Sequence, residues 1–356
     1  MVRILLYLFG ACALLAGADR MIGNRFGLGR SFDRALELFP PIIASMAGIL
    51  ILAPAIAELL ARVISPLYRA LGLDPSLFGG VLAIDMGGYQ IAESLADDPA
   101  IGKFSGVVLG ATLGCTVSYG IPVGMEFCRE GRSADFIRGT LYGIMTLPPA
   151  AFVGALLTGL SARTAAISCI PVLFLSALIA VGILFRPMGT EKVFRAFSAF
   201  LRVLSAVGLT LGAFQSITGL QLVKRLMSLE EALAIVASIG IVLLGALPFG
   251  ELLTRLLRRP LAALSRRMKL SPETPSDLLL VYLTITPGLA ALPQLDAAGC
   301  RAVAAFAVSG ASALTAHLAF TLSFAPELAG PLLAAKTLGA LLALCLSLLL
   351  ERKRKA

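Results

Sequence analysis

The chain has 356 residues, of which 58% are hydrophobic and only 14% are charged, and its mean hydropathy is +0.91. Soluble domains carry about 25% charged residues, so this composition excludes an ordinary water-soluble protein and predicts an all-α polytopic membrane protein. The formal net charge of +9 does not predict nucleic-acid binding, because the basic residues sort to one side of the predicted spans.

Apolar stretches near the ~20 residues that a helix needs to cross a bilayer recur along the chain. The first is short, and Ala16-Gly17-Ala18 resembles a cleavage site, so a removed signal peptide is the alternative to the retained anchor that we expect. In chain order, the predicted spans are Ile4–Ala18, Phe39–Leu60, Phe104–Phe127, Gly139–Leu160, Thr164–Phe185, Val193–Ile217, Ala232–Leu252, Ala302–Phe324 and Pro331–Leu350.

Two more apolar segments, Phe78–Leu95 and Leu278–Leu295, are interrupted by glycine or proline. We predict that each enters the membrane and returns to the same side, because irregular backbone at that depth is tolerated only inside protein or along a cavity. Each segment is also long enough to cross the bilayer, so two additional full spans are the alternative. The predicted architecture is about nine transmembrane helices plus two re-entrant hairpins.

Parts of the sequence recur. Glu58-Leu59-Leu60-Ala61-Arg62 returns as Glu251-Leu252-Leu253-Thr254-Arg255, and Gly110-Ala111 returns as Gly310-Ala311. The first hairpin would enter from outside and the second from inside, which makes an inverted-topology repeat of the kind that holds substrates near the midplane of secondary transporters. Within one transmembrane domain, 1–356, we assign repeat 1 to 39–127, connecting helices to 139–217, repeat 2 to 232–324, and a last helix with a basic tail to 331–356.

The distribution of basic residues predicts the orientation. With these spans, about three quarters of the lysines and arginines fall on one side, which the positive-inside rule makes cytoplasmic. The N-terminus is therefore predicted to lie outside and the C-terminus inside.

Asp85 lies in the apolar part of the first hairpin and is followed by Met86, Gly87 and Gly88. A carboxylate in such surroundings costs several kcal/mol unless a cation, a water-filled cavity or a substrate offsets that cost. Because the glycines should break the helix and free backbone polar groups, the sequence predicts a site for a small cation. The alternative roles of Asp85 are a cap at the helix break or a partner of Lys336.

Several segments resemble one known family. Asp74-Pro75-Ser76-Leu77-Phe78-Gly79-Gly80-Val81-Leu82-Ala83-Ile84-Asp85-Met86-Gly87-Gly88-Tyr89 closely resembles the ethanolamine-utilisation membrane protein family, EutH. Weaker likenesses are the span from Ser105-Gly106 to Ile121-Pro122, Ala305-Phe306-Ala307-Val308-Ser309, His317-Leu318 and Lys336-Thr337-Leu338-Gly339. The resemblance covers about residues 40 to 350, and it implies a bacterial inner-membrane transporter, a facilitator or secondary carrier, that imports ethanolamine for catabolism.

Ethanolamine is mostly a hydroxyl-bearing ammonium ion at neutral pH, so its site needs an anion, hydrogen-bond partners and an aromatic face. Asp85 supplies the charge, Gln90 is a candidate partner for the hydroxyl, and His317 is a candidate pH sensor or proton carrier. Lys336 either reaches the outer interface or pairs with Asp85 until the substrate displaces it. The full set of candidate substrate-binding residues is Asp85, Met86, Gly87, Gly88, Tyr89, Gln90, Thr112, Thr116, Tyr119, Thr284, Thr286, Pro287, Gly288, His317 and Lys336.

Plainer roles exist for many of these residues. Tyr89 and Tyr119 either offer cation–π contacts or pack at an interface. Thr112 and Thr116 either line the pathway or bond back to their own helix. His317 is otherwise an ordinary buried histidine.

The second half departs from the family pattern. Thr284-Ile285 replaces a pair of asparagines, and Thr315-Ala316 replaces a Gly-Asp pair before the histidine. A polar pair and an acid are missing, so a carrier of another small amine or amino alcohol is the alternative.

Other classes of function are less well supported. The chain lacks G-x-x-x-x-G-K-[ST] and zinc spacing, so no cofactor, metal or direct use of ATP is expected, while proton or sodium coupling is left open. Ser312 and His317 are expected on different faces of one helix, which disfavours an enzyme. A membrane sensor or scaffold remains an alternative. The expected partners are the small cation and the lipid bilayer, and the oligomeric state is not predicted.

Overall fold

The computed structural model describes residues 2–82, 88–128, 131–268 and 270–355, and every regular element within them is a helix. In that part of the chain, eight helical segments are long and apolar enough to cross a membrane. Their bounds are Arg3–Met21, Leu28–Ala70, Pro99–Phe127, Ser133–Leu157, Ala162–Phe185, Lys192–Thr218, Leu229–Leu257 and Pro326–Arg352.

The elements of the first half begin with α1 (Val2–Met21), α2 (Leu28–Glu37), α3 (Phe39–Ile42), η1 (Ile43–Ala47) and α4 (Gly48–Ala70). They continue with α5 (Ser76–Val81), α6 (Gly88–Leu95), α7 (Pro99–Lys103), η3 (Phe104–Gly114), η4 (Thr116–Gly120) and α8 (Ile121–Phe127). The connecting region holds α9 (Ser133–Leu157), α10 (Ala162–Ser168), α11 (Ile170–Phe185) and α12 (Pro187–Thr218). The second half holds α13 (Leu229–Met268), α14 (Thr274–Leu283), α15 (Ile285–Ala291), η5 (Leu292–Gln294), α16 (Ala297–Gly310), α17 (Ala316–Phe324), η6 (Pro326–Leu328) and α18 (Ala329–Lys355).

The eight long segments overlap eight of the nine predicted spans, and the all-helical class is confirmed. The ninth predicted span, Ala302–Phe324, is not one helix, because it is divided between α16 and α17 by turns at residues 311–315. The expected count of nine is therefore not confirmed. Hydropathy does not detect this break, because its residues are as apolar as those of the helices beside it.

The first hairpin consists of α5 and α6, and its two ends meet. The Asp74 carboxylate accepts hydrogen bonds from the backbone N–H of Ser76 and of Asp98, both at 2.8 Å. A continuous helix over this stretch would hold its ends roughly 30 Å apart. Gly79 lets the two arms touch, since a Cβ there would lie 2.6 Å from the backbone nitrogen of Ala92.

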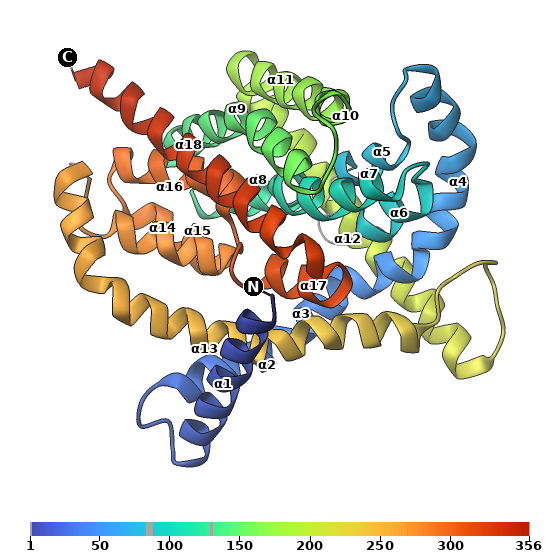
Figure 1. Cartoon of the computed structure of the whole chain (residues 1–356), viewed down its shortest axis with the longest axis horizontal. Coiled ribbons are helices and arrows are strands. Elements are labelled where there is room, and N and C mark those ends of the chain that lie inside the picture. Colours follow the sequence, from blue (N-terminus) through green and yellow to red (C-terminus); the bar gives the residue numbers. More distant parts are fainter. Residues whose placement is uncertain (1, 83–87, 129–130, 269, 356) are drawn as a thin grey trace.

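The second hairpin consists of α14 and α15, and it has the same form. Its ends also meet, because a Cβ on Gly299 would lie 2.4 Å from Oγ1 of Thr274. Its arms touch at Gly288, where a Cβ would lie 2.9 Å from the Cα of Val281. In Figure 1 the two hairpins lie on opposite sides of the molecule, with α18 crossing diagonally between them and α13 running across the picture below them.

The two predicted repeats share a further feature at the ends of their long helices. Arg62 donates to Glu58 at 3.0 Å in α4, and Arg255 donates to Glu251 at 2.8 Å in α13. Exposed ion pairs of this kind add little stability. Both pairs stand in the recurring motif, and the repeat itself stays a prediction.

The centre of the molecule is formed by α9, α16 and α18. Small residues bring these helices close together: a Cβ on Gly143 would lie 2.5 Å from the Ala305 carbonyl oxygen, and one on Gly339 would lie 2.4 Å from the Ser309 hydroxyl. Helices in membranes associate through such small-residue contacts, because burial of apolar surface gives no advantage over lipid.

The same three helices share a buried ion network. Arg301 of α16 is 5% exposed. Its guanidinium donates to both carboxylate oxygens of Glu351 in α18, at 2.5 and 2.8 Å, and to Asp135 in α9. Removing one member of such a network leaves an uncompensated buried charge, so the three residues fix the helices at this end of the bundle.

The first helix is integrated into the fold. Phe9 of α1 stacks on Phe249 of α13 with ring centroids 5.5 Å apart. The carboxylate of Asp19 accepts hydrogen bonds from the backbone N–H of Leu28 at 2.8 Å and of Gly29 at 2.9 Å, at the start of α2. An anion at a helix N-terminus is favourable, so α1 holds α2 in place.

Candidate functional site

Two stretches at the centre depart from α-helical geometry. η3 and η4 are π-helical, with backbone hydrogen bonds from residue i to i+5, which are rare and concentrate at functional sites. Between α16 and α17 the chain turns, and Ser312 has a φ of 51°. Ala111 belongs to the first stretch and Ala311 to the second, so the two departures occur where the sequence repeat pairs Gly110-Ala111 with Gly310-Ala311.

Threonine hydroxyls stabilise the π-helical stretch. Oγ1 of Thr112 donates to the Val108 carbonyl at 2.7 Å, and Oγ1 of Thr116 donates to the Thr112 carbonyl at 2.8 Å. These hydroxyls occupy carbonyls that backbone N–H groups would bind in an α-helix, and the expectation that they bond back to their own helix is confirmed. Thr116 also donates to the Val308 carbonyl of α16 at 2.7 Å, which joins the two halves. That both residues contact substrate stays a prediction.

Lys336 of α18 is completely buried, with 0% exposure. Its ammonium group donates to the carbonyl oxygen of Ala111 in η3 at 2.5 Å. The alternative in which this side chain reaches the outer interface is wrong, because no part of it is accessible. An ammonium ion at such depth is costly unless polar groups surround it, and the π-helical backbone supplies one of them.

His317, the only histidine, contacts the carbonyl that the sequence repeat pairs with that of Ala111. It is 2% exposed, and its Nδ1 lies 2.9 Å from the carbonyl oxygen of Ala311. Because a carbonyl can only accept, Nδ1 carries a proton in this contact. Two matched carbonyls, Ala111 and Ala311, thus each bind the nitrogen of a buried side chain.

The break at residues 311–315 is braced by the second hairpin. Ser312 N–H donates to the Val281 carbonyl at 2.9 Å, and the Ser312 hydroxyl accepts from Ile285 N–H at 3.1 Å. Thr315 Oγ1 donates to the Leu283 carbonyl. The expectation that Ser312 and His317 share one helix is therefore wrong, because Ser312 lies in the turns between α16 and α17. The backbone polar groups that this break frees are paired with those that the second hairpin frees between α14 and α15.

The second hairpin also touches the π-helical stretch. The hydroxyls of Tyr119 in η4 and Thr286 in α15 are 2.7 Å apart. Thr286 and Pro287 are exposed, Thr284 is half-buried in an extended conformation between the two arms, and Gly288 is buried against Val281. The structure therefore brings one candidate from each predicted repeat into contact.

The structure describes three of the candidates in the first hairpin and leaves three outside the described residues. Tyr89 is 4% exposed and packs edge-on against Phe320 of α17, with ring centroids 5.6 Å apart, which is the packing role that the sequence left open. Gln90 is half-buried, and its Oε1 has no hydrogen-bond partner in the described part of the chain. Gly88 is buried at the start of α6. Asp85, Met86 and Gly87 lie outside the described residues.

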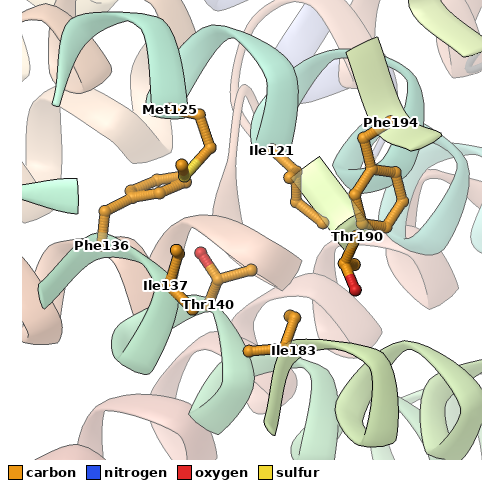
Figure 2. Close-up of a pocket in the computed structure, with 8 residues that line it drawn as sticks. All are labelled: Ile121, Met125, Phe136, Ile137, Thr140, Ile183, Thr190 and Phe194. Atoms are coloured by element: carbon orange, nitrogen blue, oxygen red, sulfur yellow. The ribbon is translucent and has the colours of Figure 1, made fainter. Parts of the chain in front are cut away.

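Two small voids lie beside the centre. One, drawn in Figure 2, has a volume of about 10 Å³ and receives side chains from α8, α9, α11 and α12. The other, also about 10 Å³, is lined by Thr116 and Ile285 among others. Each has room for about one water molecule. Neither Lys336 nor His317 lines either of these two voids.

Sequence reasoning missed the groups that bind these side chains. The Gly-Ala pairs were recognised as a repeat, but a carbonyl has no signature in a sequence, so the roles of Ala111 and Ala311 could not be inferred. Tyr282 of α14 was also missed, and its hydroxyl lies 2.5 Å from that of Thr337, the residue after Lys336. The recurrence of Gly110-Ala111 as Gly310-Ala311 was the one signal in the sequence that could have indicated these two positions.

Comparisons with known proteins agree with the predicted family. The family model described as "Ethanolamine utilisation protein, EutH" matches residues 1–350. The chain is 31% identical over 352 residues to "Probable ethanolamine permease EutH" of Listeria monocytogenes, which covers 99% of this chain and 94% of that protein. It is 32% identical over 334 residues to "Uncharacterized protein YxeR" of Bacillus subtilis, covering 94% and 90%. It is 29% identical over 393 residues to "Probable ethanolamine permease EutH" of Salmonella typhimurium, covering 99% and 96%.

None of the solved structures matches the chain. On this evidence, the chain belongs to the EutH family of ethanolamine utilisation proteins.

Proposed function

We propose that this chain is a multi-pass permease that carries ethanolamine, as its ammonium ion, across the bacterial inner membrane for catabolism. The observation that carries the proposal is the contact between the buried Lys336 ammonium and the Ala111 carbonyl. Lysine ends in the same CH₂–NH₃⁺ group as protonated ethanolamine. An environment that accepts one primary ammonium group has the chemistry to accept the other.

The substrate ammonium takes the place of Lys336 in this mechanism. Asp85 supplies the negative charge, and either the lysine or the substrate neutralises it, because an isolated carboxylate at this depth would be too costly. Gln90 receives the substrate hydroxyl, since its buried Oε1 lacks a partner in the described residues and an unsatisfied acceptor costs about 1–3 kcal/mol. His317 responds to proton concentration at the matching position of the second half.

Access alternates between the two sides through the two hairpins. The N-terminus lies outside and the C-terminus inside, the first hairpin enters from the outside, and the second enters from the cytoplasm. The contact between Tyr119 and Thr286 joins the second hairpin to the π-helical stretch and breaks when that hairpin moves. The proposal is supported by the names of the relatives, by the meeting ends of each hairpin and by the burial of Lys336.

Another small amine or amino alcohol is the alternative substrate. One observation favours it: Ile285 lines the void beside Thr116, at a position where the family pattern has asparagine. An apolar side chain there removes a hydrogen-bond partner and changes the shape of the nearby space.

The test is uptake of labelled ethanolamine into proteoliposomes at mildly acidic pH, with and without a pH gradient. The acidic medium matters because neutral ethanolamine crosses lipid unaided. Saturable uptake that excess unlabelled ethanolamine inhibits, and that ethylamine inhibits less, supports the proposal. Uptake that excess ethanolamine leaves unchanged would exclude ethanolamine as the substrate.

Asp85→Asn tests the anion in the same assay. We expect the variant to insert and fold but to lose saturable uptake, because the amide cannot neutralise the substrate ammonium. Glu37→Gln is the control, since Glu37 is an exposed acid at the end of α2. Normal uptake by Asp85→Asn would remove Asp85 from the site.

A further inference from the structure

A large groove lies between the first hairpin and the connecting helices, and Lys336 is not among its lining residues. The groove has a volume of about 850 Å³ and is bounded by α5, α11 and α12, with contributions from the end of α4 and from η4. Phe78 and Val81 form one wall, and Phe174, Leu178 and Phe197 form the other. Its volume is in the range of sites that bind small molecules.

The groove is apolar, and part of its lining is uncovered. Phe174 is 70% exposed and Leu178 is 56% exposed, both on α11, and Leu71 at the opposite wall is 64% exposed. α11 belongs to a helical segment of membrane-crossing length, Ala162–Phe185, so this exposed surface faces hydrocarbon rather than water. Residues 170 to 182 of α11 line it over roughly 18 Å, somewhat more than half of the ~30 Å hydrocarbon thickness.

Two basic residues stand close in the sequence to a residue that lines the groove. Thr190 of α12 lines it, and Arg186 and Lys192 flank Thr190 at the junction of α11 and α12. Both basic side chains are exposed, and neither forms an ion pair within the described residues. Arg195, one turn further on, is by contrast paired with Glu126 at 3.2 Å. Basic residues between helices at the cytoplasmic side of a membrane recognise anionic lipid headgroups.

We propose that this groove binds one anionic phospholipid, with an acyl chain between α5 and α11 and the phosphate on Arg186 and Lys192. The apolar walls match the acyl chain, the length matches about one leaflet, and the unpaired cations match the headgroup.

The bound lipid completes the wall of the first hairpin. Phe78 and Val81 belong to α5, the first arm of that hairpin, and on their groove side they face the cavity instead of another helix. The lipid is therefore a structural partner of the element that we propose moves during transport. The inference depends on the chain crossing a membrane, and it does not depend on the identity of the transported substrate.

The experiment is native mass spectrometry of the purified full chain after delipidation and titration with phosphatidylglycerol or phosphatidylethanolamine. We expect the wild type to bind one phosphatidylglycerol in preference to phosphatidylethanolamine. Arg186→Gln with Lys192→Gln should lose this preference, roughly fivefold for each charge removed. Leu178→Trp, which fills the groove, should weaken the binding of both lipids.

Matched controls stand on the same surfaces. Leu173→Trp changes an α11 residue that is 58% exposed but does not line the groove, and Arg259→Gln removes an exposed basic residue of α13. Both should bind lipid as the wild type does. The proposal is overturned if the wild type binds the two lipids equally, if Leu178→Trp and Leu173→Trp behave alike, or if Leu178→Trp only changes the oligomeric mass.

Discussion

The two halves of the molecule differ in the side chain that each binds at its interrupted backbone. In the first half the Ala111 carbonyl receives the ammonium of Lys336 at 2.5 Å, and in the second the Ala311 carbonyl contacts the His317 imidazole at 2.9 Å. The positions correspond, and both side chains are buried. One group is a compact cation, whereas the other changes its charge near neutral pH.

This difference assigns separate tasks to the two halves. In the proposed mechanism a cationic substrate competes directly with the lysine, because both need the same carbonyl and the same counter-charge. The substrate ammonium does not resemble an imidazole, so we do not expect it to displace His317. The histidine is better suited to hold or release the second hairpin. The comparison therefore predicts that substitutions at the first position affect substrate exchange and that those at the second affect the stability of the break.

Lys336→Met gives the largest expected effect. Methionine has a similar length but no charge, so the substrate ammonium binds without a competitor while the empty carrier cannot neutralise Asp85. We expect ethanolamine binding to tighten and net uptake to fall to background, measured by calorimetry and by proteoliposome uptake. Lys103→Met, which removes a lysine paired with Glu327, is the control. Wild-type uptake by Lys336→Met would end the proposed competition.

Gly79→Ala and Gly288→Ala test whether the two hairpins depend on the same close contact. A Cβ at Gly79 would lie 2.6 Å from backbone, and one at Gly288 would lie 2.9 Å from backbone. We expect each substitution to lower the free energy of unfolding by about 1–3 kcal/mol, because the arms must separate. Thermal unfolding in detergent measures this change.

Gly10→Ala serves as the control, because α1 leaves open space around that position. It should be neutral or slightly stabilising. If the two hairpin variants also unfold like the wild type, the arms do not pack as the structure describes.

These features differ in how far the sequence could predict them. Runs of apolar residues were enough to identify eight spans, and glycine or proline indicated that the two hairpin segments are interrupted, because these residues leave a direct trace in a sequence. Lys336 and His317 were recognised because a titratable residue stands out in an apolar helix.

The partners of those residues could not be predicted. The break at Ala311-Ser312-Ala313-Leu314-Thr315 contains neither glycine nor proline, so it read as continuous helix. Its geometry depends on Val281 and Leu283, which lie far away in the sequence. The π-helical stretch around Ala111 likewise has the composition of an ordinary transmembrane helix. Tertiary contacts decide both.

The second-half position is tested by comparing His317→Gln with His317→Leu. Glutamine keeps a donor for the Ala311 carbonyl, whereas leucine leaves that buried acceptor unsatisfied. We expect the leucine variant to be less stable than the glutamine variant by about 1–3 kcal/mol, measured by thermal unfolding. Equal stability of the two would show that the histidine does not brace the break.

Asp277→Asn has the smallest expected effect, and it concerns the entrance of the second hairpin. Burial, and next the charge of Glu273, raise the pKa of Asp277 to about 6 in the folded protein. The folded state therefore binds this proton more tightly than the unfolded state, so the stability that the proton provides is complete below about pH 4 and is lost as the pH rises through about 6.

Asparagine stays neutral throughout. We expect the variant to melt about 1–2 °C higher than the wild type above pH 7 and at the same temperature below pH 4. Glu273→Gln should lower the pH at which the Asp277 carboxyl loses its proton, because it removes the neighbouring negative charge. The first hairpin provides the contrast, because Asp74 at its entrance accepts two backbone hydrogen bonds at 2.8 Å. A gain at Asp277 that does not change with pH would mean that the carboxyl is not buried, and the two entrances would then differ less than the structure indicates.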